Sequence, residues 1–508
     1  MKFIDNILNK VTMYRMVLYE LIGLLVVAGI FGQFGILPYT PVSLLFSTVF
    51  IIVVSWITNK VFAWAYSAPS NPESAYITAL ILALIITPAL SFGDKSFIIF
   101  AFWASSLAMA SKYILAIRKK HLFNPAAIAV VITAFALNLS ASWWVGTAVM
   151  LPFVLFGGFL VTRKIQRFDL VVSSIIASFV VILGLSLLHG GNALALGWNV
   201  LISTPIIFFA TVMLTEPLTT PPTGLLRVPY GILTGILFAP AIHLGSVYST
   251  PELSLAISNV FSYLVSPKKK LTLKLKEIRQ LAPDTYDFIF LPDQRMKYRP
   301  GQYMEWTLSH KWPDSRGVRR YFTLASSPTE RELSLGVKFY DKGSSFKKKL
   351  LGMQVGDTIV ASGLAGDFVL PKDTKKKLVF IAGGIGITPF RSMVQYMIDK
   401  KEARDVVLLY SNKRIQDIAY EDVFDIAERT LGMKTLYAVT DPDADMPALP
   451  NVTRTIDART ISENIPDYRE RTFYLSGPHG MVTAFESVLQ SMGVKESQIK
   501  VDFFPGFA

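Results

Sequence analysis

The sequence predicts a polytopic helical membrane domain of about ten transmembrane helices, followed by an antiparallel β-barrel and an α/β domain with a parallel, doubly wound sheet. Three observations support this order. The 508 residues are 52% hydrophobic and 17% charged, against about 25% charged in a typical soluble protein. Long apolar segments fill residues 1–266. Residues 267–371 then alternate apolar and polar positions, and residues 372–508 alternate strand and helix patterns.

The membrane assignment depends on ten apolar segments. A spanning helix needs about 20 largely apolar residues, and stretches such as "VVSSIIASFVVILGLSLL" show no polar face. We expect spanning helices at about 17–35, 42–58, 75–91, 96–117, 124–140, 145–162, 170–188, 199–214, 229–247 and 253–266.

The basic residues of this half predict its orientation. "RKKH" at 118–121, "RKIQR" at 163–167 and "KKK" at 268–270 follow even-numbered segments, and the opposite loops hold little more than Lys95. Because Lys and Arg accumulate on the cytoplasmic side, both termini and the polar half are expected in the cytoplasm beneath the cell (inner) membrane. This placement also explains the net charge of +13 without a nucleic-acid partner.

Several kinds of metal and redox centre are excluded by composition. The chain has no cysteine, so it forms neither disulfides nor iron–sulfur clusters nor thiolate zinc sites. Its five histidines are scattered, and we expect no metal site. His189 and His243 do not form the paired arrangement that two stacked haems need, which disfavours haem.

Two motifs lie within the apolar half. "FNPAAIA" at 123–129 opens a helix with Asn124 as its cap and Pro125 in its first turn. "TEPLTTPPTG" at 215–224 is a cytoplasmic turn. The turn is either an ordinary connecting loop or the lining of a site for a polar ligand between helices.

These motifs and their spacing resemble the ten-helix membrane subunit shared by the Rnf complex and the sodium-pumping NADH:quinone reductase. Members of that family carry FMN esterified to a Thr in a Ser-Gly-Ala-Thr stretch. This chain has no such stretch, and the nearest candidate is Thr204 in "LISTP". The resemblance therefore implies a possible second flavin, covalent or not, or a quinone. Few acidic residues lie within the spans (Glu20 and Glu216 are near ends), so no ion path is evident.

The polar half begins with a stretch suited to a flat anionic ligand, "RRYFTLASSP" from Arg319. Arg320 can pair with a diphosphate, and Phe322 offers an aromatic face. Thr323 and Ser326 offer hydroxyl groups.

Three glycine-containing loops follow. In "DKGSSFKKKL", small residues before a short helix let backbone N–H groups approach a phosphate; these are Gly343, Ser344 and Ser345. "IAGGIGITPF" follows a strand and opens a helix, as a pyrophosphate loop does; its residues are Gly383, Gly384, Gly386, Thr388 and Pro389. "YLSGPHGM" follows the last long strand, and its turn at Gly477 and Pro478 can face a nicotinamide.

In this order the motifs resemble the ferredoxin–NADP reductase superfamily across residues 268–508. The resemblance implies FAD, with FMN less favoured, and NADH or NADPH. It maps the family's Arg-x-Tyr-Ser flavin motif onto Arg320, Tyr321, Phe322 and Thr323. It places Arg414 and Asp417 beside the adenosine and Ser476 beside the nicotinamide, where many members have Cys. The ending "VDFFPGFA" resembles endings that lay an aromatic ring on the flavin, with Phe503 and Phe504 as candidates.

The sequence therefore predicts a membrane flavin oxidoreductase. Electrons would pass from cytoplasmic NAD(P)H through FAD to a flavin, quinone or other acceptor in the bilayer. The alternative is a transport-like membrane module for flavin or another small ligand, with the reductase regulating it. Lys413, Arg414 and the lack of an acidic residue at 411–414 lean toward NADPH.

Overall fold

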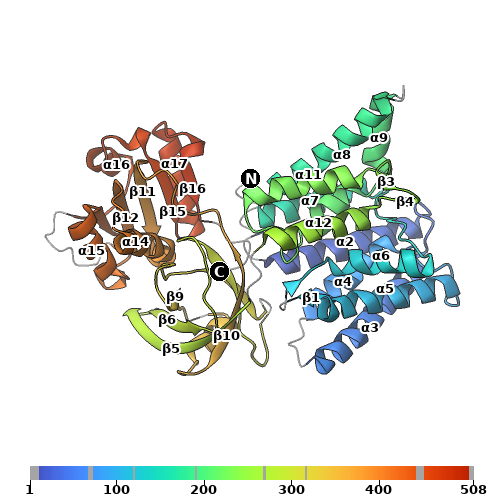
Figure 1. Ribbon diagram of the computed structural model, residues 1–508, viewed down its shortest axis with the longest axis horizontal. Helices are drawn as coiled ribbons and strands as arrows, with labels where there is room; N and C mark the ends of the chain where they lie inside the picture. The colour runs from blue at the N-terminus through green and yellow to red at the C-terminus, as the bar shows by residue number, and fades with distance from the viewer. Residues whose placement is uncertain are drawn as a thin grey trace. The chain divides into compact units, whose positions relative to one another are not determined.

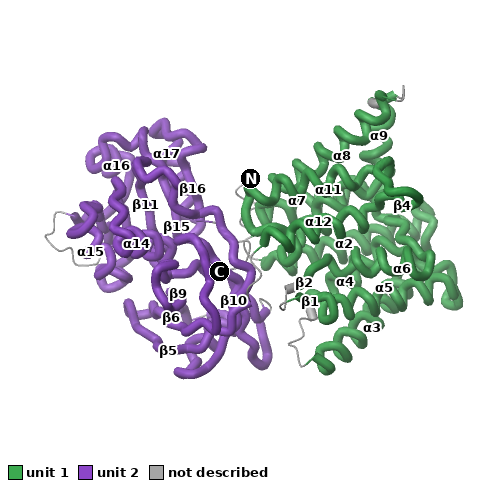
Figure 2. Tube along the Cα trace, in the orientation of Figure 1, with its two compact units in different colours: residues 1–268, 505–507 green, residues 269–504, 508 purple. Residues whose placement is uncertain are grey.

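The computed structural model describes residues 8, 11–66, 72–117, 120–188, 192–266, 270–314, 317–341, 343–441 and 451–502. The chain divides into two compact units, one within residues 1–268 and the other within residues 269–504 (Figure 2). We call them the helical unit and the C-terminal unit.

The helical unit is a bundle of helices with two small hairpins (Figure 1). The helices are α2 Met13–Gln33, α3 Pro41–Ala65, α4 Pro72–Ile85, α5 Lys95–Ile114, α6 Pro125–Leu137, α7 Leu151–Ile165, α8 Phe168–Leu188, α9 Ala193–Ser203, α10 Ile206–Phe208, the π-helix η1 Phe209–Met213, α11 Gly224–Phe238 and α12 Pro251–Val265. The hairpins pair β1 Ala116–Ile117 with β2 Lys120–His121, and β3 His243–Leu244 with β4 Val247–Tyr248.

Local sequence explains where many of these helices begin. Six of the described helices of the helical unit start after a side chain that accepts a hydrogen bond from a backbone N–H of the first turn, which satisfies a donor that the helix cannot pair itself. The capping residues are Thr12, Thr40, Asp94, Asn124, Asn192 and Thr250.

Each of the ten predicted segments contains helix, but the helices differ in length. Among the described residues, α2, α3, α5 and α8 are long and apolar enough to cross a membrane. The helices α4, α6 and α11 are apolar but shorter. Ten spans therefore stays a prediction.

The prediction of one continuous helix at 199–214 is wrong. The chain bends by 66° between Leu194–Ser203 and Ile206–Met213. Pro205 lies at this break, where its missing N–H removes a helical hydrogen bond. The second piece continues as the π-helix η1, a form often found at functional sites.

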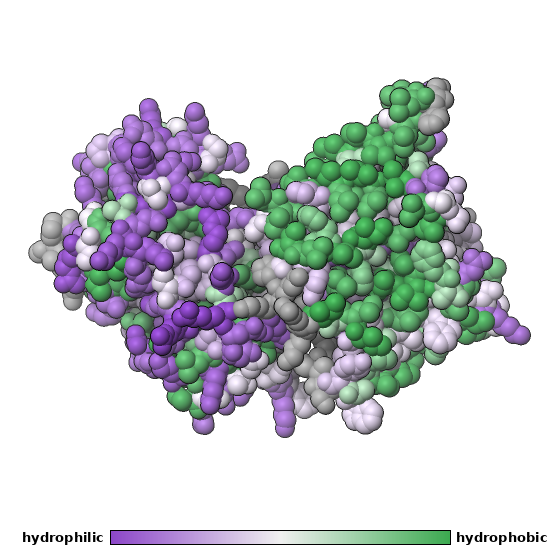
Figure 3. Space-filling view, viewed as in Figure 1, coloured by the Kyte–Doolittle hydropathy of each residue, from purple (hydrophilic) through white to green (hydrophobic). Residues whose placement is uncertain are grey.

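The surface of the helical unit is apolar over much of the face in view (Figure 3). Only 22% of the most apolar window of α2, α3 and α8 is buried within the protein. Large apolar side chains such as Val26, Leu45 and Val180 are more than half exposed. Exposed apolar surface on this scale is characteristic of helices that face lipid.

The first part of the C-terminal unit is the predicted antiparallel sheet. Its strands are β5 Leu271–Ala282, β6 Thr285–Pro292, β7 Tyr303–Thr307, β8 Arg319–Thr323, β9 Leu333–Lys338 and β10 Thr358–Ala365, in the order β8-β7-β10-β5-β6-β9. Just beyond β8, the N–H of Ala325 donates to the carbonyl of Ser334 in β9 over 3.0 Å, linking the two edge strands. The barrel interior holds Trp306, Phe288 and Phe290. The short helix α13 Ser345–Leu351 lies between β9 and β10 in the chain.

The second part is a parallel six-stranded sheet in the order β14-β13-β12-β11-β15-β16. Its strands are β11 Leu378–Gly383, β12 Val406–Asn412, β13 Lys434–Val439, β14 Val452–Thr453, β15 Thr472–Ser476 and β16 Ile499–Val501. The helices are η2 Gly384–Ile387, α14 Thr388–Lys400, η3 Ile415–Asp417, α15 Glu421–Leu431, α16 Ala458–Asn464, η4 Tyr468–Glu470, α17 His479–Ser491 and η5 Glu496–Gln498.

Helices cover both faces of this sheet, as a doubly wound fold requires. On β11, Phe380 packs with residues of α14 and α15, whereas Val379 and Ile381 pack with residues of α16 and α17. The strand order reverses between β11 and β15. Ligands of open parallel sheets bind at the carboxyl ends of the strands beside such a reversal.

Candidate functional site

Strand β8 places the predicted cation and aromatic ring on one face. Arg320 is 2% exposed, and its guanidinium lies 5.4 Å from the ring centre of Phe346 in α13. Phe322, two residues on and therefore on the same face, has its ring 5.9 Å from that of Phe346. Tyr321 points the other way and donates a 2.9 Å hydrogen bond to Glu305. The structure thus brings Arg320 and Phe322 together at the start of α13, and it separates Tyr321 from them.

The loop before α13 binds a carboxylate of the protein. Ser344 caps the helix by accepting from the Lys347 N–H over 3.2 Å. The Ser345 N–H donates to Asp314 Oδ2 over 3.0 Å, and Asp314 Oδ1 lies 3.8 Å from Arg320 Nη2. The Asp314 carboxylate therefore lies between Arg320 and the loop that contains Gly343, where we expect a diphosphate. Sequence reasoning missed Asp314.

Ser326 has structural contacts instead of a free hydroxyl. It is 1% exposed, and its Oγ accepts from the Ser334 N–H over 3.0 Å. Its carbonyl accepts from the hydroxyls of Tyr298 (3.0 Å) and Ser392 of α14 (2.6 Å). Ser326 therefore ties the barrel to the parallel sheet domain, and Thr323 is buried at the end of β8.

The two glycine loops of the parallel sheet meet at the strand-order reversal. A Cβ on Gly386 would lie 2.6 Å from the Cα of Gly477, so only glycine fits here. Gly384 has φ +52°, and a Cβ there would meet no atom within 4 Å. That backbone conformation favours glycine and leaves open space above the loop. Thr388 and Pro389 are buried in the first turn of α14, and Pro478 precedes α17.

A carboxyl group that the sequence did not indicate lies beside this junction. The hydroxyl of Ser476, the last residue of β15, donates to Asp502 Oδ2 over 3.1 Å. Burial raises the pKa of Asp502 to about 7, and the bond from Ser476 opposes that rise. Asp502 follows β16, whose register with β15 holds it there. Phe503 and Phe504 lie outside the described residues.

The predicted adenosine segment lies at the carboxyl end of β12. Arg414 is exposed and pairs with Asp441 over 3.1 Å, while Asp417 Oδ1 lies 3.9 Å from the ammonium of Lys338. Asp441 follows β13, and no local pattern connects it with Arg414. An acidic group therefore stands beside the cation that we expected to bind a 2′-phosphate.

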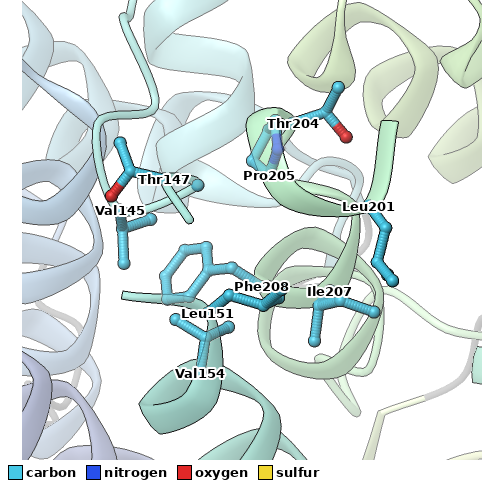
Figure 4. A pocket seen from close by; sticks show the side chains of 10 residues that line it. Val145, Thr147, Leu151, Val154, Leu201, Thr204, Pro205, Ile207 and Phe208 are labelled. Atoms are coloured by element: carbon cyan, nitrogen blue, oxygen red, sulfur yellow. The ribbon is translucent and has the colours of Figure 1, made fainter. Parts of the chain in front are cut away.

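Thr204 lies at the break of the bent helix pair (Figure 4). Its hydroxyl donates to the carbonyl of Val200 over 2.6 Å. The neighbouring pocket, lined by Phe208, Leu151 and Val154 among others, has a volume of about 190 Å³. Sites for drug-sized ligands measure about 300–1,000 Å³, so a flavin ring on Thr204 would extend beyond this pocket.

The two motifs of the helical unit meet, although 92 residues separate them. Asn124 Nδ2 donates to Glu216 Oε2 over 2.9 Å, and Thr219 donates to the same oxygen over 3.1 Å. The N–H of Asn124 donates to Asn259 Oδ1 over 2.8 Å, and Asn259 donates to the Tyr230 hydroxyl over 2.8 Å. The turn at 215–224 is therefore part of a buried polar network.

Comparison with known proteins agrees with the geometry of the C-terminal unit. An oxidoreductase FAD-binding domain model matches residues 272–370, and an oxidoreductase NAD-binding domain model matches residues 380–487. Residues 272–487 form an FAD- and NAD(P)-binding oxidoreductase module. The expected ferredoxin–NADP reductase type of architecture is confirmed for this module.

Relatives of the module occur in several proteins. A flavohemoprotein of Pseudomonas putida is 28% identical over 235 residues, which cover 46% of this chain and 58% of that protein. The glycine betaine monooxygenase reductase subunit of Chromohalobacter salexigens is 26% identical over 225 residues, covering 44% and 60%. The crystal structure of an Amycolatopsis cytochrome P450 reductase superposes with TM-score 0.41 at 24% identity, covering 47% and 70%. The chain spans less than two thirds of the length of these two curated relatives.

Proposed function

We propose that the protein is a membrane-bound NAD(P)H-dependent flavin oxidoreductase that passes electrons to an acceptor in the helical unit. The observation that carries this proposal is covalent continuity. One chain joins an FAD- and NAD-binding module to four helices that are long and apolar enough to cross a membrane. The flavin-binding module is thus covalently joined to helices whose surface is suited to lipid, so an acceptor in those helices belongs to the same chain as the flavin.

Within the module, the described residues fit the two cofactors. Arg320 and the Gly343–Ser345 loop hold the FAD diphosphate where the Asp314 carboxylate now lies. Phe322 would offer its ring to the isoalloxazine, and Phe503 and Phe504, outside the described residues, stay the candidates for a further aromatic contact. The Gly383–Gly386 loop holds the NAD(P)H diphosphate at the start of α14, and Arg414 and Asp417 contact the adenosine side.

Ser476 and Asp502 orient the nicotinamide at the loop junction with Gly477. When bound, FAD accepts a hydride from the nicotinamide and releases its two electrons one at a time. The overall balance is NAD(P)H, a proton and an oxidised two-electron acceptor giving NAD(P)⁺ and the acceptor carrying two electrons and two protons. The protein supplies binding, orientation and exclusion of water.

For the helical unit we propose ten spans with both termini and the module in the cytoplasm. The likeness to the Rnf and sodium-pumping reductase subunit, and the placement of basic residues, support this topology. We also propose that this unit holds a second flavin or a quinone, with Thr204 as the candidate attachment residue. In-gel flavin fluorescence of denatured wild type and Thr204→Ala tests attachment: a band in wild type that the variant lacks supports it, and a dark wild-type band rejects it.

The decisive experiment is anaerobic titration of the purified protein, reconstituted with FAD in lipid nanodiscs. NADH or NADPH should bleach the flavin absorbance. An added quinone should restore the absorbance and should itself be reduced to the quinol. An alternative function, a transport-like ligand module with a regulatory reductase, is supported if the flavin is bleached but is not reoxidised by any membrane acceptor. A protein that binds no flavin after incubation with FAD or FMN overturns the proposal.

A further inference from the structure

An arginine of α14, the helix that follows the first glycine loop of the parallel sheet, reaches back to the barrel. The side chain of Arg391 is 13% exposed. Its Nη2 donates to Glu330 Oε1 over 2.9 Å, and its Nη1 donates to Glu330 Oε2. Nη1 also donates to the carbonyl of Ala325 over 3.2 Å. Both partners lie between β8 and β9 in the chain, so the barrel anchors this guanidinium.

A second carboxyl group of the barrel faces the same guanidinium. Asp287 lies in β6 and is 4% exposed. Burial raises the pKa of Asp287 to about 6, whereas the positive charge of Arg391 and the hydroxyl of Tyr420 lower it. Arg279 of β5 also lowers this pKa, and the negative charge of Glu330 raises it. At neutral pH Asp287 therefore faces Arg391 mainly as a carboxylate.

The barrel surface beside Asp287 packs directly against the first turn of α14. Gly336 of β9 is the register partner of Asp287, so the two positions point to one face of the barrel. A Cβ on Gly336 would lie 2.7 Å from Thr388 Cγ2 and 2.6 Å from the hydroxyl oxygen of Tyr420. Tyr420 has φ +60°, a conformation that a bulky residue adopts only where its surroundings hold it. Little room is left here for α14 to move toward the barrel.

The residues that hold α14 to the barrel lie on one face of this helix. Arg391 and Ser392 follow Thr388 by three and four positions, and the hydroxyl of Ser392 donates to the carbonyl of Ser326 over 2.6 Å. A buried ion pair adds little net stability compared with well-packed apolar side chains, but an arrangement that breaks the pair is strongly disfavoured. The Arg391 pair therefore restricts where the Gly383–Gly386 loop at the start of α14 can lie relative to the barrel.

We propose that Arg391 is a positioning residue for hydride transfer. Glu330 and Asp287 hold its guanidinium, and Arg391 in turn holds the start of α14 at the distance from the barrel that brings the nicotinamide to the flavin. In this step a hydride leaves the nicotinamide ring with both electrons of its C–H bond, so NAD(P)H is oxidised and FAD is reduced. Arg391 exchanges no proton or electron. The inference rests on the hydride transfer of the proposed function and is independent of any acceptor in the helical unit.

Stopped-flow reduction of the FAD-loaded full chain in nanodiscs tests this role. A series of NADH concentrations, repeated with NADPH, separates the limiting rate of flavin bleaching from the Kd of the nucleotide. Arg391→Ala should lower the limiting rate about tenfold or more, because a displacement of about 1 Å can cost about a hundredfold in rate. The Kd should change by less than about threefold, and the FAD content should stay that of wild type, because the phosphate-binding residues are untouched.

Two milder variants separate positioning from a general loss of folding. Arg391→Lys keeps one charged donor toward Glu330 and should recover part of the limiting rate. Glu330→Gln keeps the size of the side chain but removes its charge, and it should slow the limiting rate about threefold even where Arg391→Ala does not fold. The double variant of Arg391→Ala and Glu330→Gln should be no slower than Arg391→Ala alone, because residues that act as one unit are not additive.

The matched control is Arg471→Ala. Arg471 is 6% exposed and pairs with Asp405 and Asp467 over 2.7 Å each, but all three residues belong to the parallel-sheet part. Its loss should lower the Tm and leave the limiting rate unchanged. Equal limiting rates in wild type, Arg391→Ala and Glu330→Gln overturn the inference, as does an equal loss in Arg471→Ala and Arg391→Ala. Failure of the proposed function looks different: the FAD of wild type itself then stays oxidised with NAD(P)H, which overturns both.

Discussion

The hydroxyl of Ser476 donates a 3.1 Å hydrogen bond to the carboxyl of Asp502 at the junction where the two glycine loops meet. Burial raises the pKa of Asp502 to about 7 from 3.8. The folded protein therefore holds this proton more tightly than the unfolded chain does. The resulting stabilisation is complete below about pH 4, declines above that pH and is lost as the pH rises through about 7.

We expect Asp502→Asn to remove this loss. The amide cannot ionise, so the Tm of the C-terminal unit should exceed that of wild type by a few degrees at pH 8. The difference should be smaller at pH 5, where Asp502 of the folded wild type is still mostly protonated. The measurement is a thermal unfolding curve, monitored by the release of the flavin. Glu496→Gln, an exposed acid on η5, is the control and should show no such pH dependence. A pH-independent difference for Asp502→Asn would contradict the assignment.

The contact between Gly386 and Gly477 predicts a sharp sensitivity to one methyl group. In Gly386→Ala the new Cβ must push the two backbone loops apart, because it would lie 2.6 Å from the Cα of Gly477. We expect the rate of flavin reduction by NAD(P)H to fall at least tenfold, with FAD content unchanged. Gly480→Ala is the matched control, since a Cβ there meets nothing within 4 Å. Equal rates in the two variants would show that the junction does not position the nicotinamide.

Arg320 should determine FAD affinity. Its guanidinium is buried beside the start of α13, where the Asp314 carboxylate already indicates an anion site. Arg320→Ala should weaken FAD binding about 10- to 100-fold, because a charge-assisted contact to a phosphate contributes about 1.5–3 kcal/mol. Lys348→Ala, an exposed cation on the same helix, should leave the Kd unchanged. The Kd comes from titrating the FAD-free protein with FAD, and two equal values would reject the role of Arg320.

Much of this architecture follows from local sequence patterns. The alternation of buried and exposed residues along β5 is readable as a strand, and the glycine loop between β11 and α14 is readable as a phosphate loop. These signals are local because side-chain periodicity and φ preference act within a few residues. The break at Pro205 also had a local signal, which is the proline itself. Its missing N–H interrupts the helix although residues 199–214 are apolar throughout.

The residues that sequence reasoning missed are those placed by long-range contacts. Asp314 reaches Ser345 across 31 positions, and Asp502 reaches Ser476 across 26. Nothing near an isolated aspartate tells which loop will approach it. The motifs that contain Asn124 and Glu216 were each recognisable in the sequence, but nothing in the sequence indicated that the two residues meet across 92 positions.

The pair of Arg414 and Asp441 predicts the preference between the two nicotinamide cofactors. The 3.1 Å ion pair places a carboxylate where the 2′-phosphate of NADPH would approach the guanidinium. Repulsion from this carboxylate should favour NADH, whose ribose carries hydroxyls instead, and this reverses the lean toward NADPH from the sequence. Asp441→Asn should raise the ratio of kcat/KM for NADPH to that for NADH about tenfold. Asp425→Asn, an exposed acid on α15, should leave the ratio unchanged, and the same ratio in all three proteins would mean that Asp441 does not face the ribose.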